Sequence, residues 1–199
     1  MLTLIFFFVA FSLNTAVATE YKEGVDYDIV AANKTTKSEI REFFSFFCSH
    51  CYSLRQGFRE IAETFKEKAE FIENPVGLIG GDIGVQSQRA YAIALNLGIE
   101  REVEDEIFDM IHEKKVIPES NDFFIGIFES LGVSKESYEK DYTSFVTTAK
   151  VAEFDRKTKE FKIAAVPELV VNGKYLARTD NIENVDDYVG LITYLLTLP

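Results

Sequence analysis

Residues 42–52 read Glu-Phe-Phe-Ser-Phe-Phe-Cys-Ser-His-Cys-Tyr. The first half of this stretch is rich in aromatic residues and lacks helical periodicity, which is typical of a buried β-strand. From Cys51 onward, apolar residues recur at the spacing of an amphipathic α-helix. The stretch therefore predicts a strand that leads directly into a helix, with Cys48 and Cys51 at the junction.

Bulky apolar residues on both faces indicate that this strand, expected over residues 40–47, is central and covered on both sides. Alternation places Ile40, Glu42, Phe44 and Phe46 on one face, and Arg41, Phe43, Ser45 and Phe47 on the other. Glu42 is then an acid in a buried row, where its pKa rises and it can exchange protons. The alternative is an acid at a solvated strand end.

The remaining elements follow the order strand, strand, helix, strand, a block of helices, hairpin, helix. We expect further strands at residues 27–30, 70–76, 166–171 and 174–177, helices with breaks over 86–162, and a last helix near 183–196. The fourth helix of the block is expected to start at Ser134 and to bury Tyr138, Tyr142, Phe145 and Ala149. This order favours one α/β scaffold with a helical insertion, in the ranges 19–80, 81–150 and 151–199, over two sequential domains.

Composition excludes several classes of protein. The chain has 199 residues, 21 Lys and Arg against 33 Asp and Glu, and a net charge of −12, which disfavours nucleic-acid binding. Two cysteines are too few for a disulfide-stapled mini-protein or a four-thiolate zinc site. A mixed site would need His112, the only histidine besides His50, which we read as a solvated helix residue. We therefore expect no metal and no other cofactor.

The N-terminal segment resembles a secretory signal peptide, residues 1–18. An apolar run from Leu2 to Leu13 is too short for a stable membrane anchor, and residues 16–18 supply the small-x-small pattern of a cleavage site. The alternatives are a buried N-terminal strand or an uncleaved anchor. Cleavage near Ala18 predicts an exported chain in an oxidising compartment, where a vicinal cysteine pair can persist as a disulfide.

A Cys-x-x-Cys pair at the start of a helix is a redox arrangement. Cys48 lies near the unpaired N–H groups of the first turn, which favour a thiolate, and Cys51 at i+3 lies on the same side. We expect Cys48 to be the exposed nucleophile and Cys51 the buried resolving thiol. The His50 imidazole can stabilise the Cys48 thiolate, which makes the disulfide form a strong oxidant. The alternatives are a structural disulfide and an ordinary first-turn histidine.

Residues 42–52 closely resemble the active-site region of the DsbA family of periplasmic thiol:disulfide interchange proteins. Val166-Pro167, followed by residues 170–175, resembles that family's cis-proline strand and hairpin, and residues 80–82 resemble the start of its helical insertion. The resemblance implies a thioredoxin fold with an inserted α-helical domain. It also implies oxidation of unfolded, newly exported proteins in the periplasm and reoxidation by a DsbB-like membrane oxidase.

The resemblance also assigns roles to residues. It implies that Cys48 forms the mixed disulfide, that Cys51 resolves it, that His50 stabilises the thiolate and that Glu42 is the family's buried acid. For substrate binding it points to Val166 and Pro167, to Phe58 in a groove, and to Ser49 between the cysteines.

Two positions depart from the family pattern. Ser49 stands where the best-known members have proline, and Glu73 stands where a buried lysine is common. Two acids without that cation would disfavour double ionisation. We therefore predict a monomeric dithiol oxidase whose strength as an oxidant is open. The alternatives are a disulfide isomerase or reductase, and a chaperone-like binding module in which the cysteine pair is a structural disulfide.

Overall fold

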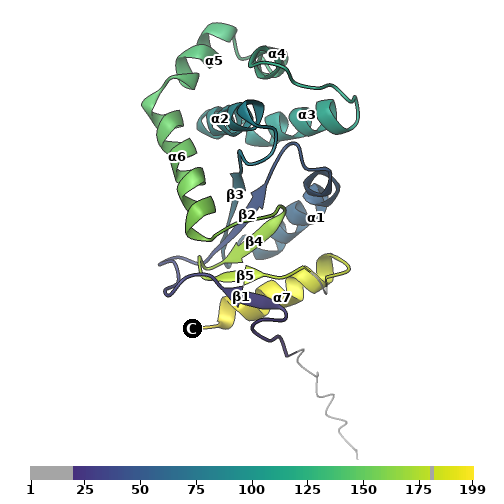
Figure 1. Ribbon diagram of the computed structural model, residues 1–199, viewed down its shortest axis with the longest axis vertical. Helices are drawn as coiled ribbons and strands as arrows, with labels where there is room; N and C mark the ends of the chain where they lie inside the picture. Colours follow the sequence, from purple (N-terminus) through teal and green to yellow (C-terminus); the bar gives the residue numbers. More distant parts are fainter. Residues whose placement is uncertain (1–19, 180–181) are drawn as a thin grey trace, which may run out of the picture.

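The computed structural model describes residues 20–179 and 182–199, so the predicted signal peptide lies outside the described residues. Five strands form one sheet in the order β1-β5-β4-β2-β3 (Figure 1). They are β1 (Tyr27–Ile29), β2 (Glu39–Phe44), β3 (Glu70–Pro75), β4 (Glu168–Val171) and β5 (Tyr175–Ala177). None of the helices in the described part of the chain is long and apolar enough to cross a membrane.

The central strand is β2, which pairs in parallel with β3 and antiparallel with β4. Its burial on both faces is confirmed, since Ile40, Phe43 and Phe44 are almost fully buried. The strand ends at Phe44, earlier than predicted. The Ser45 side chain accepts a hydrogen bond from the Phe47 amide (3.2 Å), and its carbonyl accepts one from the Cys48 amide (3.1 Å). These bonds turn the chain toward α1, because a serine can offer its neighbours an alternative to the sheet ladder.

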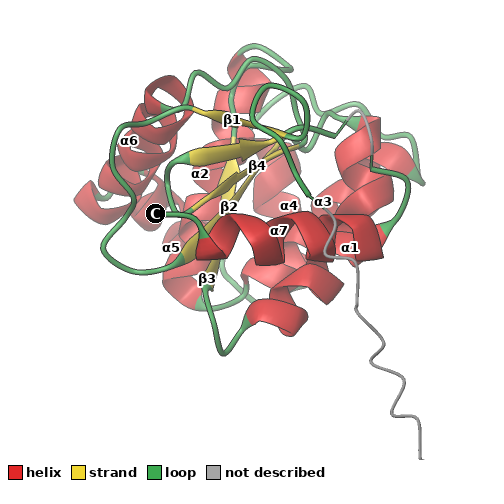
Figure 2. Cartoon of the chain, turned by 90° about the horizontal axis from the view of Figure 1, so that it is seen from below, coloured by secondary structure: helices red, strands yellow, loops and turns green. Residues whose placement is uncertain are grey.

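Two helices cover one face of the sheet. α1 (Ser49–Phe65) connects β2 to β3, and α7 (Val185–Thr197) packs against it (Figure 2). A reciprocal capping box between Asn184 and Asp187 sets the first turn of α7. Apolar side chains of both helices form one core with residues of the sheet, among them Ile40, Phe58, Ile61, Leu169, Tyr188 and Ile192. This packing holds α1, and therefore the cysteine pair at its start, against the sheet.

A block of helices is inserted between β3 and β4 and covers one end of the sheet (Figure 1). It comprises α2 (Asp82–Leu97), α3 (Glu100–His112), α4 (Asp122–Ser130), α5 (Lys135–Tyr142) and α6 (Phe145–Glu160). Its core is continuous with the turn between β2 and α1 (residues 45–48), because Phe44, Phe46 and Cys51 pack in the same cluster as Tyr91 and Phe108. Residue 150 lies inside α6, and the division of the chain into domains stays a prediction.

The prediction of one helix running on from Ser134 is wrong. Ser134 does cap α5, but that helix ends at Tyr142. The Ser144 side chain accepts a hydrogen bond from the Thr147 amide (3.1 Å) and starts α6 as a separate helix. Because α6 starts anew, its buried face does not continue that of α5. Phe145 is therefore 85% exposed, and Ala149 is also exposed.

Two phenylalanines of α6 give a direct test of this packing. Phe154 is 1% exposed, so Phe154→Ala should lower the free energy of unfolding by about 3–5 kcal/mol. Phe145→Ala should change it by less than about 0.5 kcal/mol, because the ring is in solvent. Urea unfolding of both variants measures the difference, and similar losses would contradict the separate start of α6.

Candidate active site at the start of α1

Cys48 occupies the N-cap position of α1. Its backbone is extended (φ −97°, ψ 113°), and its Sγ accepts a hydrogen bond from the Cys51 amide at 3.2 Å. The side chain is half-buried. A sulfur atom placed against the free N–H groups and the positive end of the helix dipole is stabilised as a thiolate. The geometry therefore gives Cys48 the surroundings of a nucleophile.

Cys51 has a different environment although it is one turn away. It is 1% exposed, and both cysteines are free thiols in the structure. Burial raises the pKa of the Cys51 thiol far above its ordinary value, and the neighbouring Cys48 sulfur and Glu42 carboxyl add to the rise. Cys51 therefore keeps its proton unless another group removes it.

The segment before β4 lies beside Cys48. The peptide bond between Val166 and Pro167 is cis, and the Cys48 thiol donates a hydrogen bond to the Val166 carbonyl at 3.5 Å. Pro167 is buried, whereas Val166 is partly exposed. The fold thus brings together two motifs that lie 118 residues apart in the sequence.

Glu42 lies in the buried part of β2, which overturns the alternative of an acid at a solvated strand end. The side chain is 5% exposed, and its register partner on β3 is Glu73. Burial raises the pKa of Glu42 well above its ordinary value, and the charges of Glu73 and Glu104 raise it further. The opposing influence comes from the Arg59 guanidinium, which lowers this pKa. The cation near these acids is therefore Arg59 of α1, whereas the lysine that is common in the family would stand at the Glu73 position of β3.

Glu104 on α3 is buried like Glu42, and the sequence reasoning missed it. It is 5% exposed, and burial together with the charge of Glu73 raises its pKa to about 7, against the stabilising Arg59. Arg59 donates to Glu104 at 2.8 Å and to Asp105 at 2.6 Å. A signal was present, because Glu104 shares the apolar stripe of Ile107 and Phe108 at helical spacing.

A polar cavity leads to this cluster of acids. Tyr91 is fully buried and donates a hydrogen bond from its hydroxyl to Glu73. Both residues line a cavity of about 300 Å³ whose other charged residues are Glu70, Glu100, Arg101, Lys150 and Glu153. Solvent in this cavity would contact Glu73, the acid paired with Glu42.

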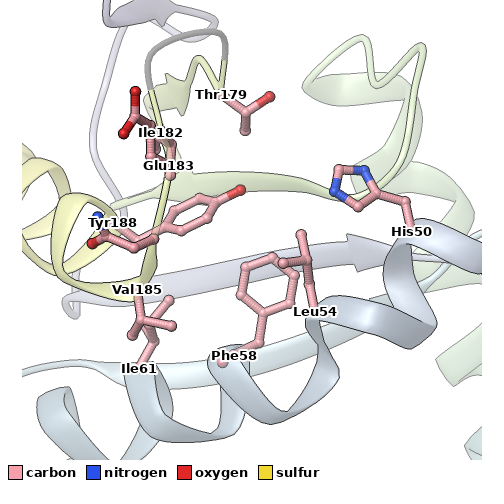
Figure 3. Close-up of a pocket in the computed structure, with 11 residues that line it drawn as sticks. His50, Leu54, Phe58, Ile61, Thr179, Ile182, Glu183, Val185 and Tyr188 are labelled. Atoms are coloured by element: carbon pink, nitrogen blue, oxygen red, sulfur yellow. The ribbon is translucent and has the colours of Figure 1, made fainter.

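A second cavity, of about 250 Å³, lies between α1 and α7 beside the cysteine pair (Figure 3). His50 stands at one end of it, and Phe58 lies on its floor against Tyr188, with ring centroids 5.5 Å apart. Within the described part of the chain, no hydrogen bond joins the His50 imidazole to either cysteine. Ser49 and His50 are both exposed, so they are open to a bound partner.

The reading of His112 as a solvated helix residue is wrong. The side chain is half-buried, and its Nε2 lies 2.8 Å from the Phe46 carbonyl oxygen in the turn before Cys48. Its ring also stacks on Tyr52, with centroids 4.9 Å apart. One helical turn separates His112 from Phe108, which was a signal that the residue faces the core.

Comparison with known families matches residues 39–190 to the model of the DSBA-like thioredoxin domain. The chain belongs to this family. The match includes both cysteines, the acids of β2 and β3, the helical block and the cis-proline segment. The predicted thioredoxin fold with an inserted helical domain is therefore confirmed.

Individual DsbA proteins are similar along most of their length. The thiol:disulfide interchange protein DsbA of Escherichia coli is 28% identical over an alignment of 191 residues that covers 91% of this chain and 91% of the relative. A crystal structure of DsbA from Klebsiella pneumoniae superposes with a TM-score of 0.82 at 23% identity, covering 91% of this chain and all of the other. A DsbA from Proteus mirabilis, solved with the non-covalently bound peptide PWATCDS, has a TM-score of 0.81 at 27% identity, covering 90% and 100%.

The raised pKa of Glu104 predicts a pH dependence of stability. Folded Glu104 holds its proton up to about pH 7, whereas the unfolded side chain releases it near its ordinary value of 4.5. The folded chain therefore binds more protons between these values, and the free energy of unfolding falls as pH rises through them. In Glu104→Gln we expect the fall between pH 5 and pH 8 to be smaller by on the order of 2–3 kcal/mol.

Urea unfolding of the reduced protein at several pH values measures this change. Glu102→Gln, an exposed acid on the same helix, is the matched control and should follow the wild-type curve. Parallel curves for wild type and Glu104→Gln would show that Glu104 ionises normally in the folded protein.

Proposed function

We propose that this chain is a thiol:disulfide oxidoreductase that donates the Cys48–Cys51 disulfide to protein substrates. The observation that carries the proposal is the contrast between the cysteines: Cys48 Sγ caps a helix at the surface, and Cys51 is buried one turn later. Membership of the DSBA-like family and similarity to DsbA proteins support it.

The exchange proceeds in two steps. A substrate thiolate attacks Sγ of Cys48, the Cys48–Cys51 bond breaks, and Cys51 leaves and takes up a proton. A second substrate thiolate then attacks the substrate sulfur of the mixed disulfide, and Cys48 leaves as a thiolate stabilised by the start of α1. Two substrate thiols are oxidised to one disulfide, and the two protein cysteines are reduced.

Substrate binding is assigned to the surfaces on either side of Cys48. The Val166 carbonyl beside Sγ can accept a hydrogen bond from an extended substrate backbone. The apolar cavity at Phe58, with His50 at its end, can take a side chain of the substrate (Figure 3). Ser49 lies exposed between the cysteines and would contact the same segment. The peptide complex of the Proteus mirabilis relative, whose peptide contains a cysteine, supports a groove of this kind.

We assign to Glu42 the exchange of a proton with the Cys51 thiol. Its pKa is raised well above the ordinary value, which favours the protonated carboxyl, so it can supply a proton when Cys51 leaves and accept one when Cys51 attacks. Glu73 and Tyr91 connect it to the polar cavity, which offers a route for protons to solvent.

The cellular setting follows from the family. We propose that the chain acts as a monomer in the periplasm after cleavage near Ala18, oxidises unfolded exported proteins, and is reoxidised by a DsbB-like membrane oxidase. The names of its relatives support interchange of disulfides with proteins. The first test concerns chemistry alone, because the reaction requires no partner from the cell.

Alkylation with iodoacetamide of the reduced protein tests the assignment of the two thiols. Cys48 should react quickly at mildly acidic pH, whereas Cys51 should react at least about a hundredfold more slowly, since it is buried and keeps its proton. Mass spectrometry of the digested protein gives the rate of each site. Equal rates at both cysteines would overturn the proposal.

Cys48→Ser separates the oxidase from a chaperone-like binding module. The oxidase predicts that the variant cannot oxidise a reduced model protein, whereas a binding module would keep its full effect on aggregation of that protein.

The reduction potential in glutathione buffers separates an oxidase from a reductase or isomerase, since a thioredoxin-like value of about −270 mV would favour a reductase.

Glu42→Gln tests the proton transfer. When the reduced variant is mixed with glutathione disulfide, attack by Cys48 should keep its rate, and attack by Cys51 on the mixed disulfide should slow by at least about tenfold. Acid quenching at timed intervals would show the mixed disulfide accumulating. Glu60→Gln, an exposed acid on α1, is the control. An unchanged second step would reduce Glu42 to a structural residue.

A further inference from the structure

The contact of His112 with the active-site turn joins two parts of the fold. His112 is the last residue of α3 in the helical block, and Phe46 lies 66 residues earlier in the turn between β2 and α1. The ring nitrogen Nε2 lies 2.8 Å from the Phe46 carbonyl oxygen. A carbonyl can only accept, so Nε2 carries the hydrogen and donates it.

The ring of His112 is held in place before it makes this bond. It stacks on Tyr52 with an interplanar angle of 14° and lies 5.8 Å from the ring of Phe108. Tyr52 is itself fixed, since its hydroxyl donates to Glu113 at 2.5 Å and the Arg55 guanidinium lies 4.8 Å from its ring centre. A donor with so little freedom loses little entropy when it binds the carbonyl.

The turn that accepts the bond determines where Cys48 lies. Phe46 is two residues before Cys48, and its ring is fully buried among Phe44, Tyr91 and Phe108. Inside the turn, the Phe47 amide donates to Ser45 Oγ and the Cys48 amide donates to the Ser45 carbonyl. His112 adds a side chain from the helical block that hydrogen-bonds the backbone of this turn.

We propose that His112 is a positioning residue, whose hydrogen bond to the Phe46 carbonyl holds the active-site turn so that Cys48 Sγ stays at the start of α1. The inference rests on the proposed function, in which Cys48 is the nucleophile. The bond matters most in the reduced form, because there Sγ is held by the turn and by its hydrogen bonds to the Cys51 amide and the Val166 carbonyl, without a covalent link. In the oxidised form the disulfide itself holds Sγ.

This difference between the two redox forms predicts a change in reduction potential. His112→Phe keeps an aromatic ring for Tyr52 but has no donor, so the reduced form loses stability relative to the oxidised form. We expect the equilibrium constant for oxidation by glutathione disulfide to rise about fivefold, which lowers the potential by about 20 mV. Alkylation of Cys48 should slow by a similar factor.

The conservative variant distinguishes positioning from packing. His112→Gln has a side-chain amide that can donate to the same carbonyl, and it should restore at least half of the change. His112→Leu is a second variant without a donor and should behave like His112→Phe. Glu102→Gln, an exposed acid on the same helix, is the control and should keep the wild-type potential.

The result that overturns the inference is a wild-type potential in both His112→Phe and His112→Leu. A purely structural role would lower the stability of oxidised and reduced forms alike and leave the potential unchanged. The alkylation rates of the wild-type protein separate this outcome from failure of the proposed function. If wild-type Cys48 reacts faster than Cys51 but the variants keep the potential, only the role of His112 is lost.

Discussion

The chemistry of the site depends on the placement of one sulfur atom at the start of a helix. Cys48 Sγ accepts the hydrogen bond that a serine or aspartate oxygen accepts at an ordinary helix start. A thiolate there is stabilised by the free N–H groups and the dipole of the helix. The surrounding elements fix the position of this sulfur. β2 leads directly into the turn before Cys48, α7 packs against α1, and the Val166 carbonyl lies beside the sulfur.

The acids beneath the cysteines form the second layer of this arrangement. Three carboxyl groups, those of Glu42, Glu73 and Glu104, lie close enough for each to influence the ionisation of another. Burial and the repulsion between carboxylates raise the pKa of Glu42 and that of Glu104 above the ordinary value. Arg59 offsets part of this repulsion through its bond to Glu104. Such a cluster suits a site where a buried thiol must lose and regain a proton.

The helical block shares its core with the redox site. The aromatic side chains of Phe44 and Phe46 pack against Tyr91 and Phe108, so the end of β2 and the turn after it are built partly from the insertion. α3 alone contributes Glu104 to the acids and His112 to the turn. An insertion that packs this way can tune the chemistry of a scaffold whose cysteines it does not carry.

Local patterns in the sequence predicted much of the fold. The aromatic run and the change to helical periodicity at Cys51 placed β2 and α1. The end of β2 and the break between α5 and α6 were not predicted. Each of these two boundaries depends on whether one serine side chain, Ser45 or Ser144, accepts a hydrogen bond from a nearby amide. The pattern of apolar residues does not predict whether such a bond forms.

The sequence by itself determined that two cysteines, one turn apart, stand where a buried strand meets a helix. That information is local, because helix starts and i, i+3 neighbours arise from adjacent residues. Only the tertiary structure decided that Glu104 and Arg59 join Glu42 and that His112 reaches the Phe46 carbonyl. These residues come from α1, α3, β2 and the turn after β2. The distances between them depend on how the helical block packs on the sheet, and the spacing of residues along the chain does not predict that packing.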